Sequence, residues 1–294
     1  MQTVKFLDID CLQLENDSLS LLVTESVGPR ILSLRYKGGP NLFAEVPDSI
    51  TSHPDGTIFH FYGGHRLWHA PEAMPRTYVP DDEPVVATSG PGSLTVTRPA
   101  EPLTGLEKSI QITLVESRPQ VIVRHSLTNR GVWDVECAPW AITQFRTGGM
   151  AILPQSQEPQ DFLPNRSIAI WPYTDLASPH LKWGSRYILV HAEMSKPFKL
   201  GFPNPRGWAA YWLDGTLFVK TASFEPKASY YDFGSSSECY CNHRFLELET
   251  LGPISTLAPE ETVEHVETWE IYPDIEFPAD ESIVQSIADR LELE

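Results

Sequence analysis

The sequence predicts an all-β fold built mainly of antiparallel strands, with one short helix near the carboxyl end. Two observations indicate this class. Segments in which apolar and polar residues alternate recur along the chain, and they are bounded by Gly, Pro, Asn or Asp. Helical periodicity is scarce, while the 26 prolines punctuate long loops. We therefore expect antiparallel sheets connected by ordered loops.

The alternation is clearest in residues 120–129, where Val121, Val123, His125 and Leu127 share one face. Successive side chains of a strand point to opposite sides, so this face is buried and the polar one is exposed. The same kind of pattern predicts strands at Leu19–Val23, Arg30–Tyr36, Ser93–Arg98, Lys108–Glu116, Gln120–Asn129, Met150–Pro154, Tyr187–Ala192, Thr216–Ala222, Arg244–Leu251 and Thr262–Tyr272.

A helix is predicted only near the C-terminus. Asp280 is a good N-cap residue, and Ile283, Ile287 and Leu291 then repeat every fourth position. This spacing gives one apolar stripe, which we expect to pack on the outside of the sheets.

Length leaves the number of domains open, and the absence of a flexible linker predicts a single domain over residues 1–294. The chain is 41% hydrophobic, has no flexible linker and shows no repeat of fixed period. No apolar run approaches the ~18 residues of a membrane span. The first residues, Met1 to Phe6, lack the pattern of a signal peptide, so we expect a cytoplasmic protein without membrane contact. Its cysteines, Cys11, Cys137, Cys239 and Cys241, are expected to be reduced structural thiols.

The charge balance narrows the class of partner. The formal net charge is −17, and binding to nucleic acid depends on Lys and Arg displacing counterions from phosphates. Nucleic acid is therefore excluded as an expected partner. The sequence also lacks a phosphate-binding loop, a dinucleotide fingerprint and a nucleophile elbow, so no cofactor is expected.

One short segment concentrates the polar and aromatic groups of a site. The glycine pair Gly63-Gly64 permits a tight turn, and we expect a loop there that carries the site. The residues that follow offer hydrogen-bond donors, a cation, a stacking surface and a carboxylate: His65, Arg66, Trp68, His69 and Glu72.

Several segments, in order, resemble the galactose mutarotase-like superfamily. They are Val27–Leu34, Tyr62-Gly63-Gly64 with Trp68, Leu127–Gly131, Phe245–Thr250, Leu257–Thr262 and Trp269. The resemblance covers most of the chain and concerns the plan of the superfamily, since no single motif is diagnostic. It implies a large antiparallel β-supersandwich that handles sugars. Within the superfamily, Gly-Gly-His-Arg-Leu-Trp and Ala138–Thr143 look most like an uncharacterised branch.

The resemblance implies acid–base chemistry at an anomeric centre, as in aldose 1-epimerases. Glu249 matches the position of the family's general base, and partial burial would raise the pKa of such a carboxyl group. The family's central histidine has no counterpart in Trp140–Phe145, so His65 and His69 are the expected acids by location, with His125 behind them.

Other residues are expected to bind the substrate. Guanidinium groups and aromatic rings suit sugar hydroxyls and the apolar face of a pyranose, respectively. The expected binding residues are Arg30, Arg66, Trp68, Glu72, His125, Trp140, Gln144, Lys220 and Glu247. Structural alternatives are an ion pair for either arginine, core packing for the tryptophans and a hydrogen-bonded core position for His125. For Glu247, and for Glu249 as well, the alternative is a solvent-exposed face of an antiparallel strand.

Three further alternatives remain at this point, one for a metal site and two for the function. His65, His69 and Glu72 have spacing that could ligate zinc, but Gly63-Gly64 and Pro71 argue against the helix that such a short motif needs, so no metal is expected.

The functional expectation is a carbohydrate-active, aldose epimerase-like enzyme acting on a small-molecule sugar as a monomer or homodimer. The alternative is a non-catalytic sugar-binding module of the same fold, and a lyase or hydrolase accessory domain is a third reading.

Overall fold

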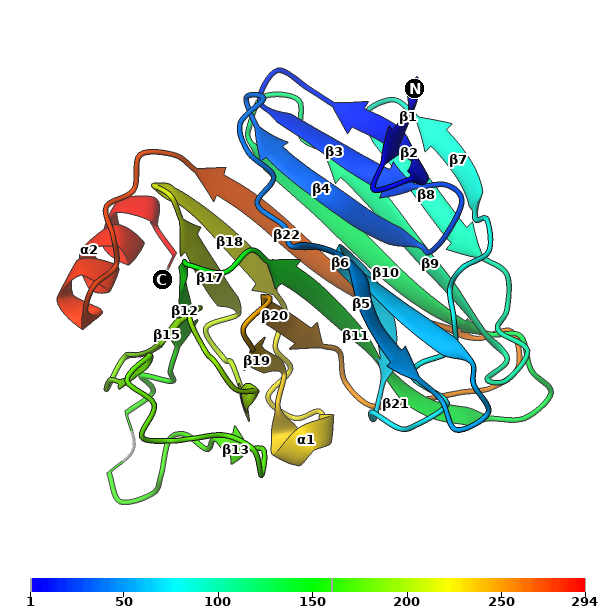
Figure 1. Cartoon of the computed structure of the whole chain (residues 1–294). Helices are drawn as coiled ribbons and strands as arrows, with labels where there is room; N and C mark the ends of the chain where they lie inside the picture. The colour runs from blue at the N-terminus through cyan, green and yellow to red at the C-terminus, as the bar shows by residue number, and fades with distance from the viewer. Residues whose placement is uncertain (1, 160, 294) are drawn as a thin grey trace.

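Two large antiparallel sheets face each other in the structure, a computed structural model that describes residues 2–159 and 161–293 (Figure 1). In hydrogen-bonding order, the first sheet contains β1 (Gln2–Phe6), β2 (Ile9–Glu15), β3 (Leu19–Thr24), β4 (Arg30–Tyr36), β6 (Ile58–Ala70), β11 (Val135–Phe145), β20 (Leu246–Leu251), β19 (Ser237–Cys241), β16 (Phe198–Phe202) and β13 (Ala169–Ile170). Two further strands join it: β5 (Glu45–Ser52) pairs with β6, and β21 (Ser255–Leu257) pairs with β11.

The second sheet is also antiparallel throughout. Its order is β14 (Leu181–Trp183), β15 (Tyr187–His191), β12 (Met150–Pro154), β17 (Trp208–Leu213), β18 (Thr216–Ala222), β22 (Thr262–Tyr272), β10 (Gln120–Asn129), β9 (Leu106–Leu114), β8 (Ser93–Arg98) and β7 (Val86–Gly90). The predicted all-β class is confirmed, and β4, β8, β10, β12, β18 and β22 have the predicted bounds.

The main core lies between the two sheets. Val121, Val123, His125 and Leu127 on β10 all point into it, as their alternation predicts, and all are fully buried. The centre is aromatic: the ring of Trp269 lies edge-on to Phe43 with 5.8 Å between centroids. Such edge contacts add to the large apolar area that each ring buries.

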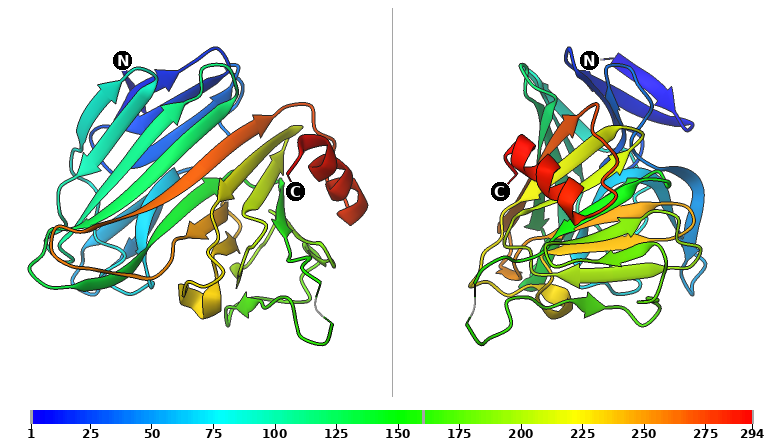
Figure 2. Two further views of the ribbon diagram at one scale, coloured as in Figure 1. Left: turned by 180° about the vertical axis from the view of Figure 1, so that it is seen from behind. Right: turned by 90° about the vertical axis from the view of Figure 1, so that its left-hand side faces the viewer.

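The predicted helix is α2 (Glu281–Leu291), and Asp280 caps it by accepting hydrogen bonds from the amides of Ser282 and Ile283. Val284, Ile287 and Ala288 are buried against residues of β12, β15, β17 and β18 that face away from the main core. The helix therefore covers the outer face of the second sheet at one end of the molecule (Figure 2). Neither α2 nor the four-residue turn α1 (Tyr231–Gly234) is long enough to cross a membrane.

The Gly63-Gly64 segment differs from the prediction, because it lies inside a strand instead of a loop. Strand β6 pairs with β5 up to Gly63 and with β4 from His65 onward. At the change of partner, Gly63 and Gly64 have φ of 103° and 70°. A Cβ on Gly63 would lie 1.9 Å from the Ala44 carbonyl oxygen, so the backbones approach too closely there for any side chain. The glycines thus bend the strand without ending it.

Candidate functional site

A pocket of about 420 Å³ opens on the outer face of the first sheet. Strands β6, β11, β16, β19 and β20 each contribute side chains to it, and the neighbouring residues on each strand point to the core between the sheets, because side chains alternate along a strand. Residues from loops and β5 complete the wall. The lining residues are Ser49, Phe61, Arg66, Trp68, Glu72, Tyr78, Trp140, Ile142, Tyr173, Pro197, Lys199, Tyr240, Asn242, Phe245 and Glu247.

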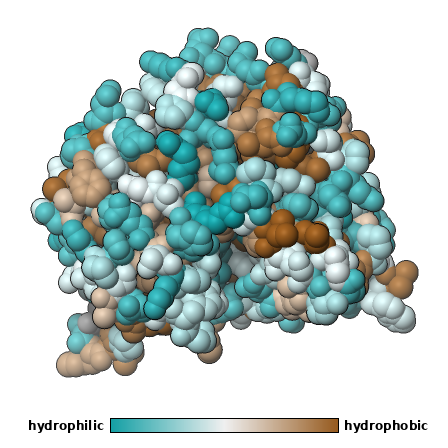
Figure 3. Space-filling model, viewed as in Figure 1, coloured by the Kyte–Doolittle hydropathy of each residue, from teal (hydrophilic) through white to brown (hydrophobic). Residues whose placement is uncertain are grey.

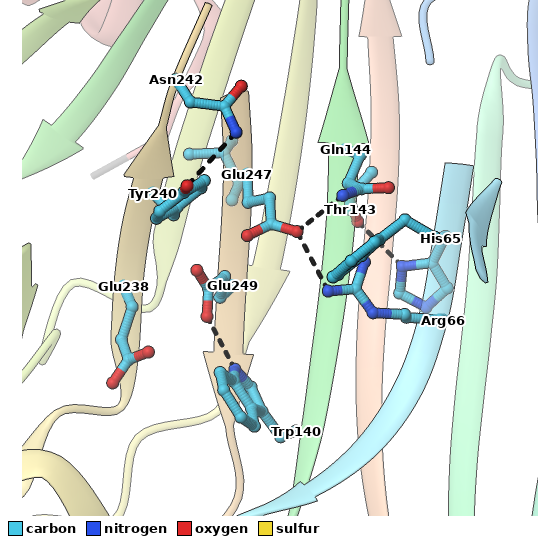
Figure 4. A network of polar contacts seen from close by, with 12 residues as sticks. His65, Arg66, Trp140, Thr143, Gln144, Glu238, Tyr240, Asn242, Glu247 and Glu249 are labelled. Atoms are coloured by element: carbon cyan, nitrogen blue, oxygen red, sulfur yellow. Dashed lines mark hydrogen bonds and ion pairs between the residues drawn. The ribbon is translucent and has the colours of Figure 1, made fainter. Parts of the chain in front are cut away.

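Glu247 on β20 accepts hydrogen bonds from side chains of two other strands of the sheet, β6 and β11. Its Oε1 accepts hydrogen bonds from Arg66 Nη2 at 3.0 Å and from Gln144 Nε2 at 2.9 Å (Figure 4). Burial raises the pKa of Glu247, and the Arg66 charge acts in the opposite direction. Nε and Nη1 of Arg66 have no acceptor among the described residues, which leaves two buried donors unpaired.

Lys199 on β16 is a second buried charge in the pocket. Its ammonium lies 2.7 Å from Glu238 Oε2 and 3.0 Å from Glu249 Oε2, and Trp140 Nε1 donates to that same Glu249 oxygen at 2.8 Å. The two carboxylates hold the pKa of Lys199 well above its usual value despite its burial. Burial and the Glu249 charge raise the pKa of Glu238. Glu249, the expected base, therefore shares its oxygen between two donors.

Aromatic side chains form much of the pocket wall. The Arg66 guanidinium stacks on the Trp68 ring at 4.2 Å, and the Lys199 ammonium lies 4.7 Å from the centre of the Trp140 ring. Trp68 and Trp140 are themselves in edge contact, with 5.4 Å between ring centroids. The pocket thus combines flat apolar surfaces with fixed charges.

Glu72 lies at the exposed mouth of the pocket. It accepts a short hydrogen bond from the Tyr78 hydroxyl, and both residues line the cavity. Burial, followed by the Glu72 charge, raises the pKa of Tyr78, so its phenol stays protonated at neutral pH.

The histidines expected to act as acids lie on the opposite face of β6 from the pocket. His65 and His69 alternate with Arg66 and Trp68, so they point into the core between the sheets, where both are fully buried. Burial lowers the pKa of both imidazoles well below the usual value. His65 and His69, which we expected to share a cavity with Glu249, therefore lie on the other face of the first sheet from that residue.

His65 and His125 instead belong to a hydrogen-bonded network between the sheets. His125 Nδ1 donates to the His265 carbonyl at 2.9 Å, which leaves its Nε2 as an acceptor for His65 Nε2–H at 2.7 Å. His65 Nδ1 then accepts from the Thr143 hydroxyl. These bonds use both ring nitrogens of each neutral imidazole. His125 is therefore a hydrogen-bonded core residue and does not face the pocket.

Arg30 and Lys220 also lie away from the pocket. Arg30 donates to Asp81 through Nε at 2.6 Å and to the carbonyls of Phe61 and His60, so its donors are used within the chain. Lys220, between the sheets, pairs with Glu267 at 2.9 Å. Of the expected binding residues, the pocket wall contains Arg66, Trp68, Glu72, Trp140 and Glu247, while Gln144 contacts it through Glu247.

Sequence reasoning missed Lys199, Glu238 and Tyr240. Residues 237–241 alternate polar and cysteine side chains, and Cys239 and Cys241 are buried in the core. The same alternation places Glu238 and Tyr240 together on the other face of the strand. This pattern in the sequence could have identified them as candidates for the pocket. Lys199 lies between two core residues, Phe198 and Leu200, in the same way.

The chain is similar to known proteins in its structure and not in its sequence. No family model matches the chain, and no curated protein matches its sequence. Solved structures match over most of the chain: a galactose mutarotase-like protein from Lactobacillus casei ATCC 334 has 10% identity and a TM-score of 0.59, covering 89% of this chain and 100% of that one. The chain has the galactose mutarotase-like fold. The predicted supersandwich is thereby confirmed.

Two further structures share this fold. A protein from Escherichia coli K12, provisionally named an aldose 1-epimerase, has 13% identity and a TM-score of 0.55, covering 90% of this chain and 99% of that one. A Klebsiella pneumoniae protein with the same provisional name has 10% identity and a TM-score of 0.60, covering 97% and 83%. At such identities the likeness establishes the galactose mutarotase-like fold, and the chemistry must be argued from the pocket.

Proposed function

We propose that the pocket binds a small sugar and interconverts its anomers by acid–base chemistry, with Glu247 as the proton donor. The observation that carries the proposal is a buried carboxyl group with a raised pKa in the wall of an aromatic pocket. The volume of about 420 Å³ falls within the range of about 300–1,000 Å³ typical of small-molecule sites. The fold-sharing proteins named as mutarotase-like or as aldose 1-epimerases support a sugar as the ligand.

The aromatic walls suit the ring of a sugar. A pyranose presents C–H groups on its faces and hydroxyls at its edge, and Trp68 and Trp140 offer flat surfaces for those C–H groups. Arg66, Lys199 and Asn242 supply donors for the hydroxyls. An ammonium has three N–H donors, and two on Lys199 serve Glu238 and Glu249, so the third is free for a ligand oxygen.

Anomer interconversion needs two proton transfers. The base removes the proton of the anomeric hydroxyl while the acid protonates the ring oxygen, so that the bond from C1 to the ring oxygen breaks and a carbonyl forms. Protonated Glu247 gives its proton to the ring oxygen, and Glu72, held by Tyr78, accepts the hydroxyl proton. Ring closure on the other face of the carbonyl returns both protons. Glu249 keeps Lys199 and Trp140 in place beside these two groups.

The test is the rate at which freshly dissolved α-D-glucose and α-D-galactose equilibrate, followed by polarimetry. The wild type should accelerate at least one of them over buffer, and Glu247→Gln and Glu72→Gln should each lower the catalysed rate by about 10²-fold or more. Glu116→Gln, at an exposed turn, is the matched control and should leave the rate unchanged. Unchanged rates in both pocket variants would contradict these roles.

One observation favours the non-catalytic alternative: no histidine is among the described residues that line the pocket. A sugar-binding module would use the same aromatic walls without proton transfer. Calorimetric titration with the same sugars distinguishes the two functions, because the module would bind a sugar and leave its anomerisation at the rate in buffer.

A further inference from the structure

The edge hairpin of the second sheet carries two histidines directly opposite each other. Leu181 of β14 pairs with Val190 of β15, so His180 and His191 are the next opposed pair, and the His191 amide donates to the His180 carbonyl at 2.8 Å. Opposed residues of antiparallel strands have Cβ atoms about 4.5–5.5 Å apart and project to the same side. Their ring centroids are 5.9 Å apart.

A carboxylate completes this group. Glu193 Oε2 lies 3.5 Å from His191 Nδ1 and 4.0 Å from His180 Nδ1, and the ligand atoms of all three residues lie within 4.8 Å of one another. The side chains are 32%, 29% and 55% exposed for His180, His191 and Glu193, so their rotamers can adjust. Zinc bonds of about 2.0–2.2 Å to nitrogen and oxygen would require only a small contraction of this triangle.

We propose that His180, His191 and Glu193 form a zinc-binding site, with water as the fourth ligand. Two imidazoles and one glutamate are a ligand set that zinc accepts in tetrahedral geometry, and solvent reaches the open position. The ligands come from the two strands of one hairpin and the residues that flank them. A bound ion therefore cross-links the beginning of β14 to the end of β15.

A second group of possible metal ligands, His65, His125 and Glu267, is buried between the sheets and is less suited to an ion. Its ligand atoms are also close, but the two histidine Nε2 atoms share a hydrogen bond of 2.7 Å, and Lys220 lies 2.9 Å from Glu267. An ion there would replace a satisfied network and face a buried ammonium. The surface group has neither obstacle.

The zinc site lies beside a second cavity of about 240 Å³, which His180 lines together with Asp175, Met194 and Pro197. Pro197 also lines the pocket of Glu247, and the chain that leads to His180 carries Tyr173 of that pocket. Zinc would thus fix the segments on one side of the pocket. The site itself does not depend on the function proposed for the pocket.

The experiment is isothermal titration of the metal-free chain with ZnCl₂, with any polyhistidine tag removed. The wild type should bind one equivalent, and the His180→Ala, His191→Ala double variant should lose that binding or weaken it at least tenfold. His243→Ala removes an exposed histidine elsewhere and should bind as the wild type does. Thermal unfolding without metal checks that each variant is folded.

A second readout uses the expected cross-link. Because a ligand that binds only the folded chain stabilises it, zinc should raise the unfolding temperature of the wild type and of His243→Ala but not that of the double variant. The proposal is overturned if the wild type takes up no more zinc than the double variant, or if His243→Ala loses the binding instead.

Discussion

Lys199 is the residue on which the charge balance of the pocket depends. One ammonium serves two buried carboxylates, Glu238 and Glu249, at 2.7 and 3.0 Å. Two carboxylates that share one cation cannot both ionise without leaving a net negative charge in the interior, and the raised pKa of Glu238 expresses this. The raised pKa favours the protonated form of Glu238 beside the Lys199 ammonium.

Replacing Lys199 by Met removes the cation and leaves two buried carboxyl groups without a positively charged partner. Breaking a buried ion pair in this way costs about 3–5 kcal/mol, and we expect a loss of that size in the free energy of unfolding measured with urea. Arg124→Met is the control, because the Arg124–Glu264 pair is 43% and 49% exposed and should contribute at most about 1 kcal/mol. Equal losses in the two variants would contradict the account of Lys199.

At this scale the sequence indicated which residues lie together better than the direction in which they point. Arg66, Trp68, Trp140 and Glu247, which the sequence suggested as binding residues, all line the pocket, and their part in binding stays a prediction. His65 was misplaced because a residue in a loop has no fixed face, whereas a residue in a strand does. Once Arg66 faces the pocket, the neighbouring histidine must face the core.

At the scale of elements, the bend in β6 sets the position of the site. The strand changes partner at Gly63-Gly64 and continues to Ala70, which brings Arg66 and Trp68 beside β11. Strands with simple alternation, such as β10 and β22, could be predicted from sequence with correct bounds. Strand β6 could not, since only its tertiary partners show that the glycines mark a close approach instead of a turn.

Substitution of Gly64 by Ala tests this reading of β6. The new Cβ would lie 2.2 Å from the Ile31 carbonyl oxygen at a φ of 70°, so strands β4 and β6 must separate. We expect a loss of about 1–3 kcal/mol or more in unfolding free energy. Gly56→Ala is the matched control: its φ is also positive, at 87°, but no atom lies within 4 Å of the added Cβ. A loss no larger than that of Gly56→Ala would contradict the close approach.

At the scale of the whole molecule, the buried carboxyl groups on the pocket side of the first sheet and those between the two sheets have pKa values shifted in opposite directions. On the pocket side, burial raises the pKa of Glu238 and Glu247. Between the sheets, the Lys220 ammonium, 2.9 Å from Glu267, lowers the pKa of that carboxyl group against the effect of burial. The contributions of Glu238 and Glu247 to stability are therefore lost as pH rises, and the contribution of Glu267 is lost as pH falls.

The variant Glu238→Gln isolates one of these contributions. The folded-state pKa of Glu238 is raised, so its contribution is fully present below the unfolded value of about 4.3 and is lost as pH rises through the folded value. Glutamine does not titrate. The unfolding free energy of the variant should therefore increase relative to the wild type between about pH 4 and pH 8. A constant difference across this range would contradict a protonated Glu238.

The most direct test of the account is a crystal structure of the chain soaked with the sugar that it binds most tightly in the titration. We expect the sugar in the pocket, with one face of its ring against Trp68 or Trp140 and the ring oxygen within hydrogen-bonding distance of Glu247. A sugar bound elsewhere on the molecule, with this pocket filled only by solvent, would contradict the central claim.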